Sequence, residues 1–241
     1  MMTLSLIRLD PDPAKAALWM AAEGLVRDGN DDGYGWHALL AASFGTLSPK
    51  PFRVVARPGR PPQLLAYSLQ SLDELLAHAR DFADPLVIAA LRLERAEAKR
   101  MPVIGEGRRL GFEVRLRPTL RRDRDGDRTR TAEVDVYVAA REAAKEGPAP
   151  DRGEVYRAWL EAKLAAGGAR LEVARAVEMR QVPLLRRDRD RRLTRVEGHS
   201  AIFVGTLTTQ DAQAFNALLA RGVGRHRAFG YGMLLLRPPE A

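Results

Sequence analysis

A tyrosine and a histidine three residues apart, Tyr34 and His37, have the side chains and the spacing for acid–base chemistry. They follow a glycine-rich turn near the start of a helix expected over residues 36–44, which would bring both side chains to one surface. An imidazole with an ordinary pKa of about 6.5 gives or takes a proton at neutral pH, and a phenol orients groups or stabilises developing charge. That pair is sufficient for metal-free RNA cleavage, in which the substrate's own 2′-hydroxyl attacks the adjacent phosphate. The motif alone is weak, because such a pair at a helix start more often has a structural role.

Residues 222–232 form a second candidate, a short loop rich in glycine and in basic side chains. Glycine lets a backbone approach a ligand closely, and arginine and histidine suit a phosphate ligand. The loop does not match the dinucleotide-binding motif G-x-G-x-x-G, because Arg227 stands where that motif has its third glycine. The loop also leads from a helix into a strand, whereas the motif leads from a strand into a helix. A hairpin or a helix C-cap would explain Gly222 alone. We therefore predict a loop that contacts RNA phosphates through Gly222, Gly224, Arg225, His226, Arg227, Gly230 and Gly232.

Two similar segments rich in arginine and aspartate, residues 120–125 and 185–190, each lie at an expected strand junction. Residues 121–130 hold five arginines against three aspartates, which is typical of a solvated hairpin end. Residues 186–195 hold six arginines against two aspartates and stay strongly positive. Closely spaced cations suit the phosphates of an RNA duplex. We predict that this second segment, named the basic arm, binds RNA through Arg186, Arg187, Arg189, Arg191, Arg192 and Arg195.

The charge balance favours a nucleic-acid partner. The chain of 241 residues carries 39 Lys plus Arg against 31 Asp plus Glu, a net charge of +8 and a pI near 10.3. Most of the positive charge is arginine, whose planar fork suits phosphate contacts and base stacking, so RNA or DNA is a better expectation than a membrane. An arginine-rich proteome with a high GC bias would give the same composition.

Several classes of chemistry lack support in the sequence. The absence of cysteine excludes disulfides, thiolate zinc sites and cysteine nucleophiles. No spacing of His, Asp and Glu resembles a zinc or two-metal site, and no P-loop is present, so we expect neither a metal nor a cofactor. The N-terminus has no secretory pattern and no run of eighteen apolar residues occurs, which predicts a cytoplasmic protein without membrane contact.

The strands and helices that must position these residues are expected in a similar order in the two halves of the chain. The first half predicts strands over residues 3–9, 52–57, 64–69 and 86–93, with helices over 36–44 and after the capping residue Ser71. The second half predicts strands over 109–116 and 134–138, a helix capped by Asp151 that ends at Gly167-Gly168, a long hairpin of 171–182 with 194–207, a helix from Thr208 and a last strand over 231–237.

With the first arginine tip taken as an elaboration, each half has the order β-α-β-β-α-β. Two such copies indicate an α+β protein of tandem ferredoxin-like (RRM-like) domains, each an antiparallel sheet with two helices on one face. The expected division is an N-terminal domain over residues 1–97, a linker over 98–107 and a C-terminal domain over 108–241. A cleft between two such sheets is a natural place for a strand of nucleic acid.

The sequence resembles the CasE family, CRISPR-associated endoribonucleases that are subunits of the type I-E Cascade complex. The resemblance spans essentially the whole chain and is most specific over residues 222–236, which look like the family's glycine-rich loop and last strand. Residues 198–207 resemble the strand before it, and residues 110–118 resemble the strand that opens the second domain. The family has tandem ferredoxin-like folds.

The resemblance implies an activity and roles for residues already singled out. Members cut the stem-loop of CRISPR repeat RNA without metal, leave a 5′-hydroxyl and a cyclic or 3′ phosphate, and keep hold of the product. Their catalytic histidine follows a tyrosine by three residues, as His37 follows Tyr34, and their basic hairpin corresponds to the basic arm. The chain departs from the pattern where many members carry lysine in the glycine loop, because it has His226 and Arg227 there.

Three functions remain open at this point. The first is a metal-independent endoribonuclease that matures CRISPR RNA, with His37 as general acid or base and Tyr34 aligning or stabilising the scissile phosphate. The second is a structural subunit that holds the RNA hairpin in the same kind of complex without cutting it. The third, a tandem-domain enzyme for a small phosphorylated metabolite, would prefer mononucleotides to RNA.

Overall fold

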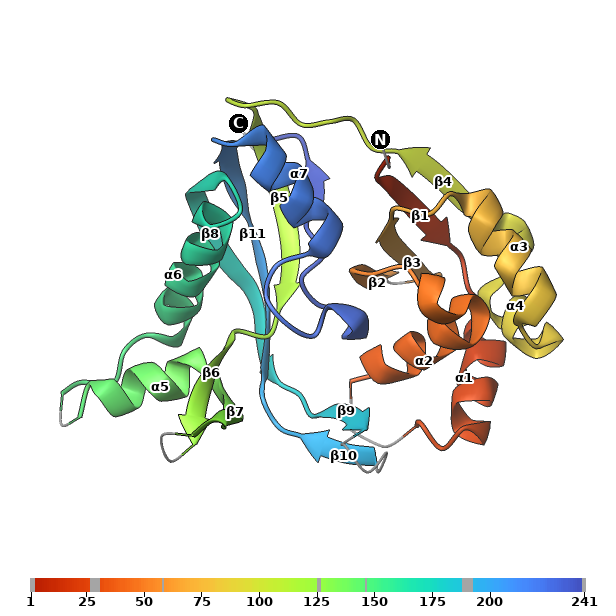
Figure 1. The fold of residues 1–241 in the computed structure, drawn as a ribbon. Coiled ribbons are helices and arrows are strands. Elements are labelled where there is room, and N and C mark those ends of the chain that lie inside the picture. Colours follow the sequence, from red (N-terminus) through yellow and green to blue (C-terminus); the bar gives the residue numbers. More distant parts are fainter. Residues whose placement is uncertain are drawn as a thin grey trace.

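The computed structural model describes residues 3–26, 31–57, 59–124, 127–145, 147–187 and 193–239. Two units lie side by side, each with a four-stranded antiparallel sheet, and a long connection after β4 joins them (Figure 1). No helix in these ranges is both long and apolar enough to span a membrane.

The first unit has the strand order β2-β3-β1-β4, in which the first and third strands of the β-α-β-β-α-β pattern are central. All its strand pairs are antiparallel. Its elements are β1 (Ser5–Leu9), α1 (Pro13–Ala22), α2 (Gly33–Phe44), β2 (Phe52–Arg57), β3 (Arg60–Ser68), α3 (Leu72–Phe82), α4 (Pro85–Leu91) and β4 (Glu97–Arg100).

The expectation of a strand over residues 86–93 is wrong, because this stretch is helix α4 followed by a short 3-10 turn. Asp84 caps α4 by accepting a hydrogen bond from the backbone N–H of Leu86, and Pro85 occupies the first helical turn. A short apolar run does not distinguish a strand from a buried helix, whereas an Asp-Pro start favours the helix. The edge strand is β4, and its residues 98–100 lie within the predicted linker. The same Asp-Pro signal, Asp12 before Pro13, begins α1, which we did not predict.

The second unit repeats the topology with two added hairpins, and its main sheet has the order β12-β5-β11-β8. Strands β6 and β7 form one added hairpin, and β9 and β10 form the other. The elements are β5 (Arg109–Leu116), β6 (Thr119–Arg124), β7 (Asp127–Asp135), α5 (Val136–Ala143), α6 (Arg152–Ala165), β8 (Ala169–Gln181), β9 (Leu184–Arg187), β10 (Leu193–Val196), β11 (His199–Thr209), α7 (Ala212–Arg221) and β12 (Leu235–Arg237).

The predicted fold class, tandem ferredoxin-like units with antiparallel sheets, is confirmed, although several boundaries are wrong. The last strand, expected over 231–237, spans only Leu235–Arg237. The strand expected over 134–138 ends at Asp135, which caps α5 through the backbone N–H of Tyr137. Thr208 belongs to β11, and the next helix begins after the capping residue Asp211. In both places a short polar side chain that satisfies a free N–H fixes the helix start.

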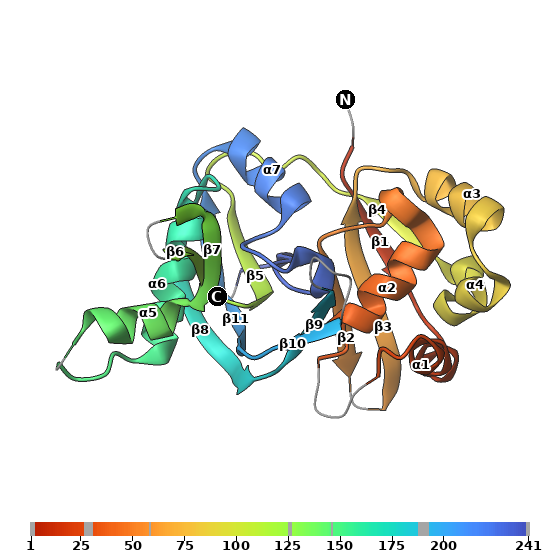
Figure 2. The same cartoon turned by 60° about the horizontal axis from the view of Figure 1, so that its bottom comes forward.

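The two units are joined by buried contacts as well as by the chain. Tyr67 of β3 is buried in the core of the second unit, where its hydroxyl donates a hydrogen bond of 2.8 Å to the carbonyl of Leu234. Conversely, Leu185 of β9 is buried in the core of the first unit. The β9–β10 hairpin therefore reaches from the second unit to α2 of the first (Figure 2).

Candidate active site

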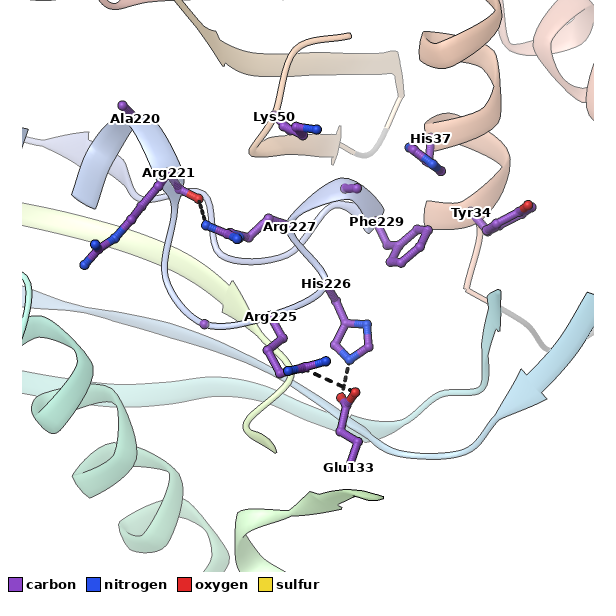
Figure 3. Close-up of a pocket in the computed structure, with 12 residues that line it drawn as sticks. Tyr34, His37, Lys50, Glu133, Ala220, Arg221, Arg225, His226, Arg227 and Phe229 are labelled. Atoms are coloured by element: carbon purple, nitrogen blue, oxygen red, sulfur yellow. Dashed lines mark hydrogen bonds and ion pairs between the residues drawn. The ribbon is translucent and has the colours of Figure 1, made fainter. Parts of the chain in front are cut away.

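An open cleft of about 820 Å³ lies where α2 meets the glycine-rich loop that follows α7 (Figure 3). Both sequence candidates, the Tyr34–His37 pair and the loop, contribute side chains to it. The lining residues are Tyr34, His37, Lys50, Glu133, Ala220, Arg221, Gly224, Arg225, His226, Arg227, Ala228 and Phe229.

The start of α2 is fixed to the second unit by Asp31, whose side chain is 2% exposed. One carboxylate oxygen accepts a hydrogen bond of 2.9 Å from the N–H of Gly33, and the other forms an ion pair with Arg115 of β5. The Arg115 guanidinium also donates to Ser200 at 3.0 Å and lies over the ring of Tyr231, 4.5 Å from its centroid. This buried network sets where α2 begins, and hence where its first turn meets the loop.

Phe229 of the loop holds the two candidate catalytic residues together. Its ring stacks on Tyr34 with centroids 5.8 Å apart and meets His37 edge-on at 5.1 Å. The backbone is equally close, because a Cβ on Gly33 would lie 2.3 Å from the carbonyl oxygen of Phe229. Sequence reasoning gave Phe229 no role, since nothing local shows that this ring reaches α2.

His37 is half-buried and points from α2 toward the cleft (Figure 3). Burial lowers the pKa of its imidazole below the ordinary 6.5, and the positive charge of Lys50 lowers it further. A lowered pKa keeps the ring neutral at neutral pH, so it is able to accept a proton.

Tyr34 lies in the same cleft but is buried, with 8% of its surface exposed. Its ring centroid is 6.0 Å from that of His37, and Figure 3 shows the phenol running away from the glycine loop. The structure thus brings Tyr34 and His37 together, as expected from the sequence. The ring of Tyr34 also packs against that of Phe229. A direct role of its hydroxyl in catalysis stays a prediction.

The backbone conformation and close packing of the glycine loop explain most of its glycines. Gly222, Gly224, Gly230 and Gly232 all have positive φ, between 73° and 81°. A Cβ would lie 2.6 Å from the Trp159 ring at Gly224 and 2.2 Å from the Val223 carbonyl oxygen at Gly232. Other residues are strained in this conformation, so the fold alone explains these glycines. Backbone contact between the loop and phosphate stays a prediction.

The three basic residues of the loop have different environments. The His226 ring hydrogen-bonds through Nε2 to Glu133 of β7, and the same carboxylate lies 3.4 Å from Nε of Arg225. Arg227 is exposed, with Nη1 donating to the carbonyl of Arg221 at 2.7 Å. Two of the three basic side chains thus already contact a carboxylate, and binding of RNA phosphates by the three stays a prediction.

Glu133 was missed by sequence reasoning, although it lies near the base of the first arginine tip. Burial alone would raise the pKa of its carboxyl group, but the hydrogen bond and charge of His226, with smaller effects of Thr119 and Arg225, lower that pKa to about 2. The carboxylate is therefore charged at neutral pH. Among the described residues that line the cleft, Glu133 is the one acidic side chain.

The described residues of the basic arm lie in β9 and β10, where Arg186 pairs with Thr194 and Arg187 with Leu193. Its base is braced by the buried Arg117, whose guanidinium donates to the carbonyls of Val182 and Val196 at 3.1 and 2.8 Å. Arg195 is exposed and forms an ion pair of 2.8 Å with Glu197. The other predicted RNA-binding residues of the arm, Arg189, Arg191 and Arg192, lie outside the described residues.

The fold and the cleft place the chain in a class of protein with tandem ferredoxin-like units and a basic cleft between α2 and a glycine-rich loop. A family model described as a CRISPR associated protein matches residues 2–238, so the chain belongs to this family. The CasE resemblance seen in the sequence is thereby confirmed at the level of family and fold. The comparison with curated protein sequences found no match.

Solved structures share the fold along the whole chain. The structure of Thermus thermophilus Cse3 bound to an RNA representing a pre-cleavage complex has a TM-score of 0.63 and 23% identity, covering 98% of this chain and 100% of that one. Cas6e from Escherichia coli str. K-12 gives 0.55 and 21%, with 98% and 100% covered. A chain of a CRISPR RNA-guided surveillance complex, pre-nicking, gives 0.54 and 18%, with 97% and 99% covered.

Proposed function

We propose that this protein is a metal-independent endoribonuclease that cleaves the stem-loop of CRISPR repeat RNA and keeps hold of the product within a Cascade complex. The observation that carries the proposal is the position of His37, whose pKa is lowered, in a cleft between two ferredoxin-like units. Family membership supports it, as do structural neighbours described as Cse3 bound to RNA and as a chain of an RNA-guided surveillance complex.

His37 acts in this scheme as the general base. Its neutral imidazole takes the proton of the substrate 2′-hydroxyl, and the 2′-oxygen attacks the adjacent phosphorus. The bond from phosphorus to the 5′-oxygen breaks, which leaves a 5′-hydroxyl on one fragment and a 2′,3′-cyclic phosphate on the other. Hydrolysis of the cyclic phosphate would give a 3′ phosphate.

Cations around the cleft stabilise the charge that develops on the phosphate oxygens. Lys50, Arg221 and Arg227 are exposed and line the cleft from different segments of the chain. Positive groups aimed at a developing charge stabilise it, and at exposed side chains such as these the effect is weakened by solvent and salt. Lys50 thus has two effects, because it attracts the phosphate and keeps His37 neutral.

The basic arm and the cleft would hold different parts of the RNA. The hairpin projects from the second unit beside α2 (Figure 2), so a duplex gripped by its arginines would have one strand near His37. Phosphate contacts position such a duplex without reading its sequence. After cleavage these contacts would persist, which accounts for retention of the product.

The test is cleavage of a repeat-derived RNA hairpin in excess EDTA, with mapping of the product ends. We expect cutting at one position and a 5′-hydroxyl product, and we expect no cutting when the nucleotide at the cut site carries a 2′-deoxy sugar. If the protein binds the hairpin tightly but leaves it whole with or without divalent metal, it is a hairpin-binding subunit. Cleavage that requires metal and survives the 2′-deoxy substitution would exclude the proposed mechanism.

A further inference from the structure

His226 and Glu133 form a partly buried pair on the wall of the cleft opposite His37. The side chains are 6% and 15% exposed, and they come from the glycine loop and from β7, which are far apart in the sequence. The loop is fixed around this histidine, because His226 has a φ of 59° and its carbonyl accepts a hydrogen bond of 2.8 Å from the N–H of Phe229. When a carboxylate binds one ring nitrogen of a fixed imidazole, the direction of the other ring nitrogen is set as well.

The second nitrogen of this imidazole is directed away from the carboxylate. Nε2 is committed to Glu133, and Figure 3 shows the other ring nitrogen, Nδ1, on the side of the ring toward Phe229. The Phe229 ring centroid lies 6.1 Å from that of His226 and 5.1 Å from that of His37. One aromatic ring therefore has a histidine on each side, and both histidines line the same cleft.

The two histidines have opposite electrostatic surroundings. His37 is half-buried with Lys50 as its charged neighbour, which disfavours the protonated ring. His226 instead has the ionised carboxylate of Glu133 as the hydrogen-bond partner of its Nε2. Two imidazoles that line one cleft with unlike charged neighbours suit different proton transfers of one reaction.

We propose that His226 is the general acid of the reaction and donates its Nδ1 proton to the departing 5′-oxygen, with Glu133 as the residue that positions its ring. This proposal rests on the proposed function. As the 2′-oxygen bonds to phosphorus, its proton passes to His37. As the bond from phosphorus to the 5′-oxygen breaks, the electron pair stays on that oxygen and the proton of His226 joins it. The reaction leaves His37 protonated and His226 neutral, so no oxidant or further reactant is needed.

A phosphate contact by His226 is the alternative, and the chemistry of the leaving group separates the two roles. A 5′-sulfur in place of the bridging 5′-oxygen departs as a stable thiolate and needs no proton. Loss of a general acid is therefore rescued by the sulfur substrate, whereas loss of a phosphate-binding group or of the base is not.

The experiment measures single-turnover cleavage of hairpins with a 5′-oxygen or a 5′-sulfur at the cut site. The variants are His226→Asn and His37→Ala, with His78→Asn of α3 as the matched control, because His78 is not among the residues that line the cleft. We expect His226→Asn to slow the oxygen substrate by about 10²- to 10⁴-fold and the sulfur substrate by less than about tenfold. His37→Ala should slow both substrates, and the control should slow neither.

A second variant keeps the proposal open to test if His226→Asn binds RNA poorly. Glu133→Gln retains the shape of the pair but removes its charge, so it should slow the oxygen substrate selectively. Equal slowing of both substrates by the two variants, or full activity of His226→Asn on the oxygen substrate, would overturn the general-acid role. Neither outcome would touch the proposed function, which instead fails if the wild-type protein leaves both substrates whole.

Discussion

At the scale of single residues, the neighbours of His37 determine which proton transfer it can perform. Burial and Lys50 both lower its pKa, while Phe229 fixes the position of its ring. A base must be unprotonated to act, so both effects increase its active fraction near neutral pH. The same imidazole in water would be partly protonated at pH 6.5 and would lose activity there.

The lowered pKa of His37 predicts the pH dependence of cleavage and the effect of Lys50. The rate should fall on the acid side with a midpoint below pH 6.5, because the folded pKa is lowered and protonation removes the base. Lys50→Met should move that midpoint upward, since it removes a charge that disfavours the protonated ring. Single-turnover rates between about pH 5 and pH 8 measure the midpoint independently of the maximal rate. An unchanged midpoint in Lys50→Met would contradict the predicted effect of Lys50 on the pKa of His37.

A second prediction concerns Asp31, which links α2 to β5. Asp31→Asn removes the partner of the buried Arg115 and should destabilise the protein by about 3–5 kcal/mol, because an unpaired buried charge remains. Asp73→Asn, at an exposed position of α3, is the matched control and should change the free energy of unfolding by less than about 1 kcal/mol. Denaturant unfolding compares the two variants. Equal stabilities would show that this ion pair does not hold the units together.

The residues that the sequence predicted are those with local signals. Tyr34 and His37 are three positions apart and share a helix, so their common location follows from the chain itself. Glu133 is 93 positions from His226, and Asp31 is 84 from Arg115, so these pairs depend on packing that no local pattern encodes. The same limit hid Phe229, whose contacts with α2 exist only in the folded protein.

At the scale of elements, the glycine loop is a rigid support for the cleft. Its positive φ values, the nearby Trp159 ring and the carbonyl of its own Val223 leave little room for side chains. The interpretation from sequence, glycines that admit a phosphate, singled out a segment that lines the cleft but did not foresee this packing. Elsewhere, caps predicted the boundaries well where they were noticed, as at Ser71, whose capping box is complete. The helix over 85–91 was misassigned because its apolar run outweighed its Asp-Pro start.

The loop's rigidity gives a third prediction. Gly224→Ala places a methyl group 2.6 Å from the Trp159 ring at a φ of +73°, so it should destabilise the protein by at least about 1 kcal/mol and slow cleavage. Gly105→Ala is the matched control, because nothing lies within 4 Å of a Cβ there. Thermal unfolding and cleavage rates should both separate the variants. A loop that tolerates the methyl group without loss of either would not be a rigid support.

At the scale of the whole molecule, the two units share one interface that also carries the cleft. Tyr67, Leu185 and the Asp31–Arg115 pair cross between the units, and the catalytic candidates lie beside these contacts. The β9–β10 hairpin extends this interface toward solvent (Figure 1). A site assembled from both units requires their relative position to be fixed before RNA binds.

The arm should supply part of the salt dependence of RNA binding. Replacing Arg186 and Arg187 with Gln should weaken hairpin binding and reduce the slope of log K against log salt by about 0.7–0.9 for each phosphate that is no longer neutralised. Titration of labelled hairpin at several salt concentrations measures this slope. The cleavage rate at saturating protein should change little, because His37 is untouched. An unchanged slope would show that these two arginines do not touch the RNA backbone.

The central claim, that His37 is the base of a metal-free RNA cleavage, is tested most directly by separating binding from cutting in one variant. His37→Ala and the wild-type protein are compared on the same repeat hairpin in excess EDTA, with affinity and single-turnover rate measured in parallel. We predict an affinity within about threefold of wild type and a rate lowered by about 10²- to 10⁴-fold. A variant that still cuts at the wild-type rate would contradict the claim.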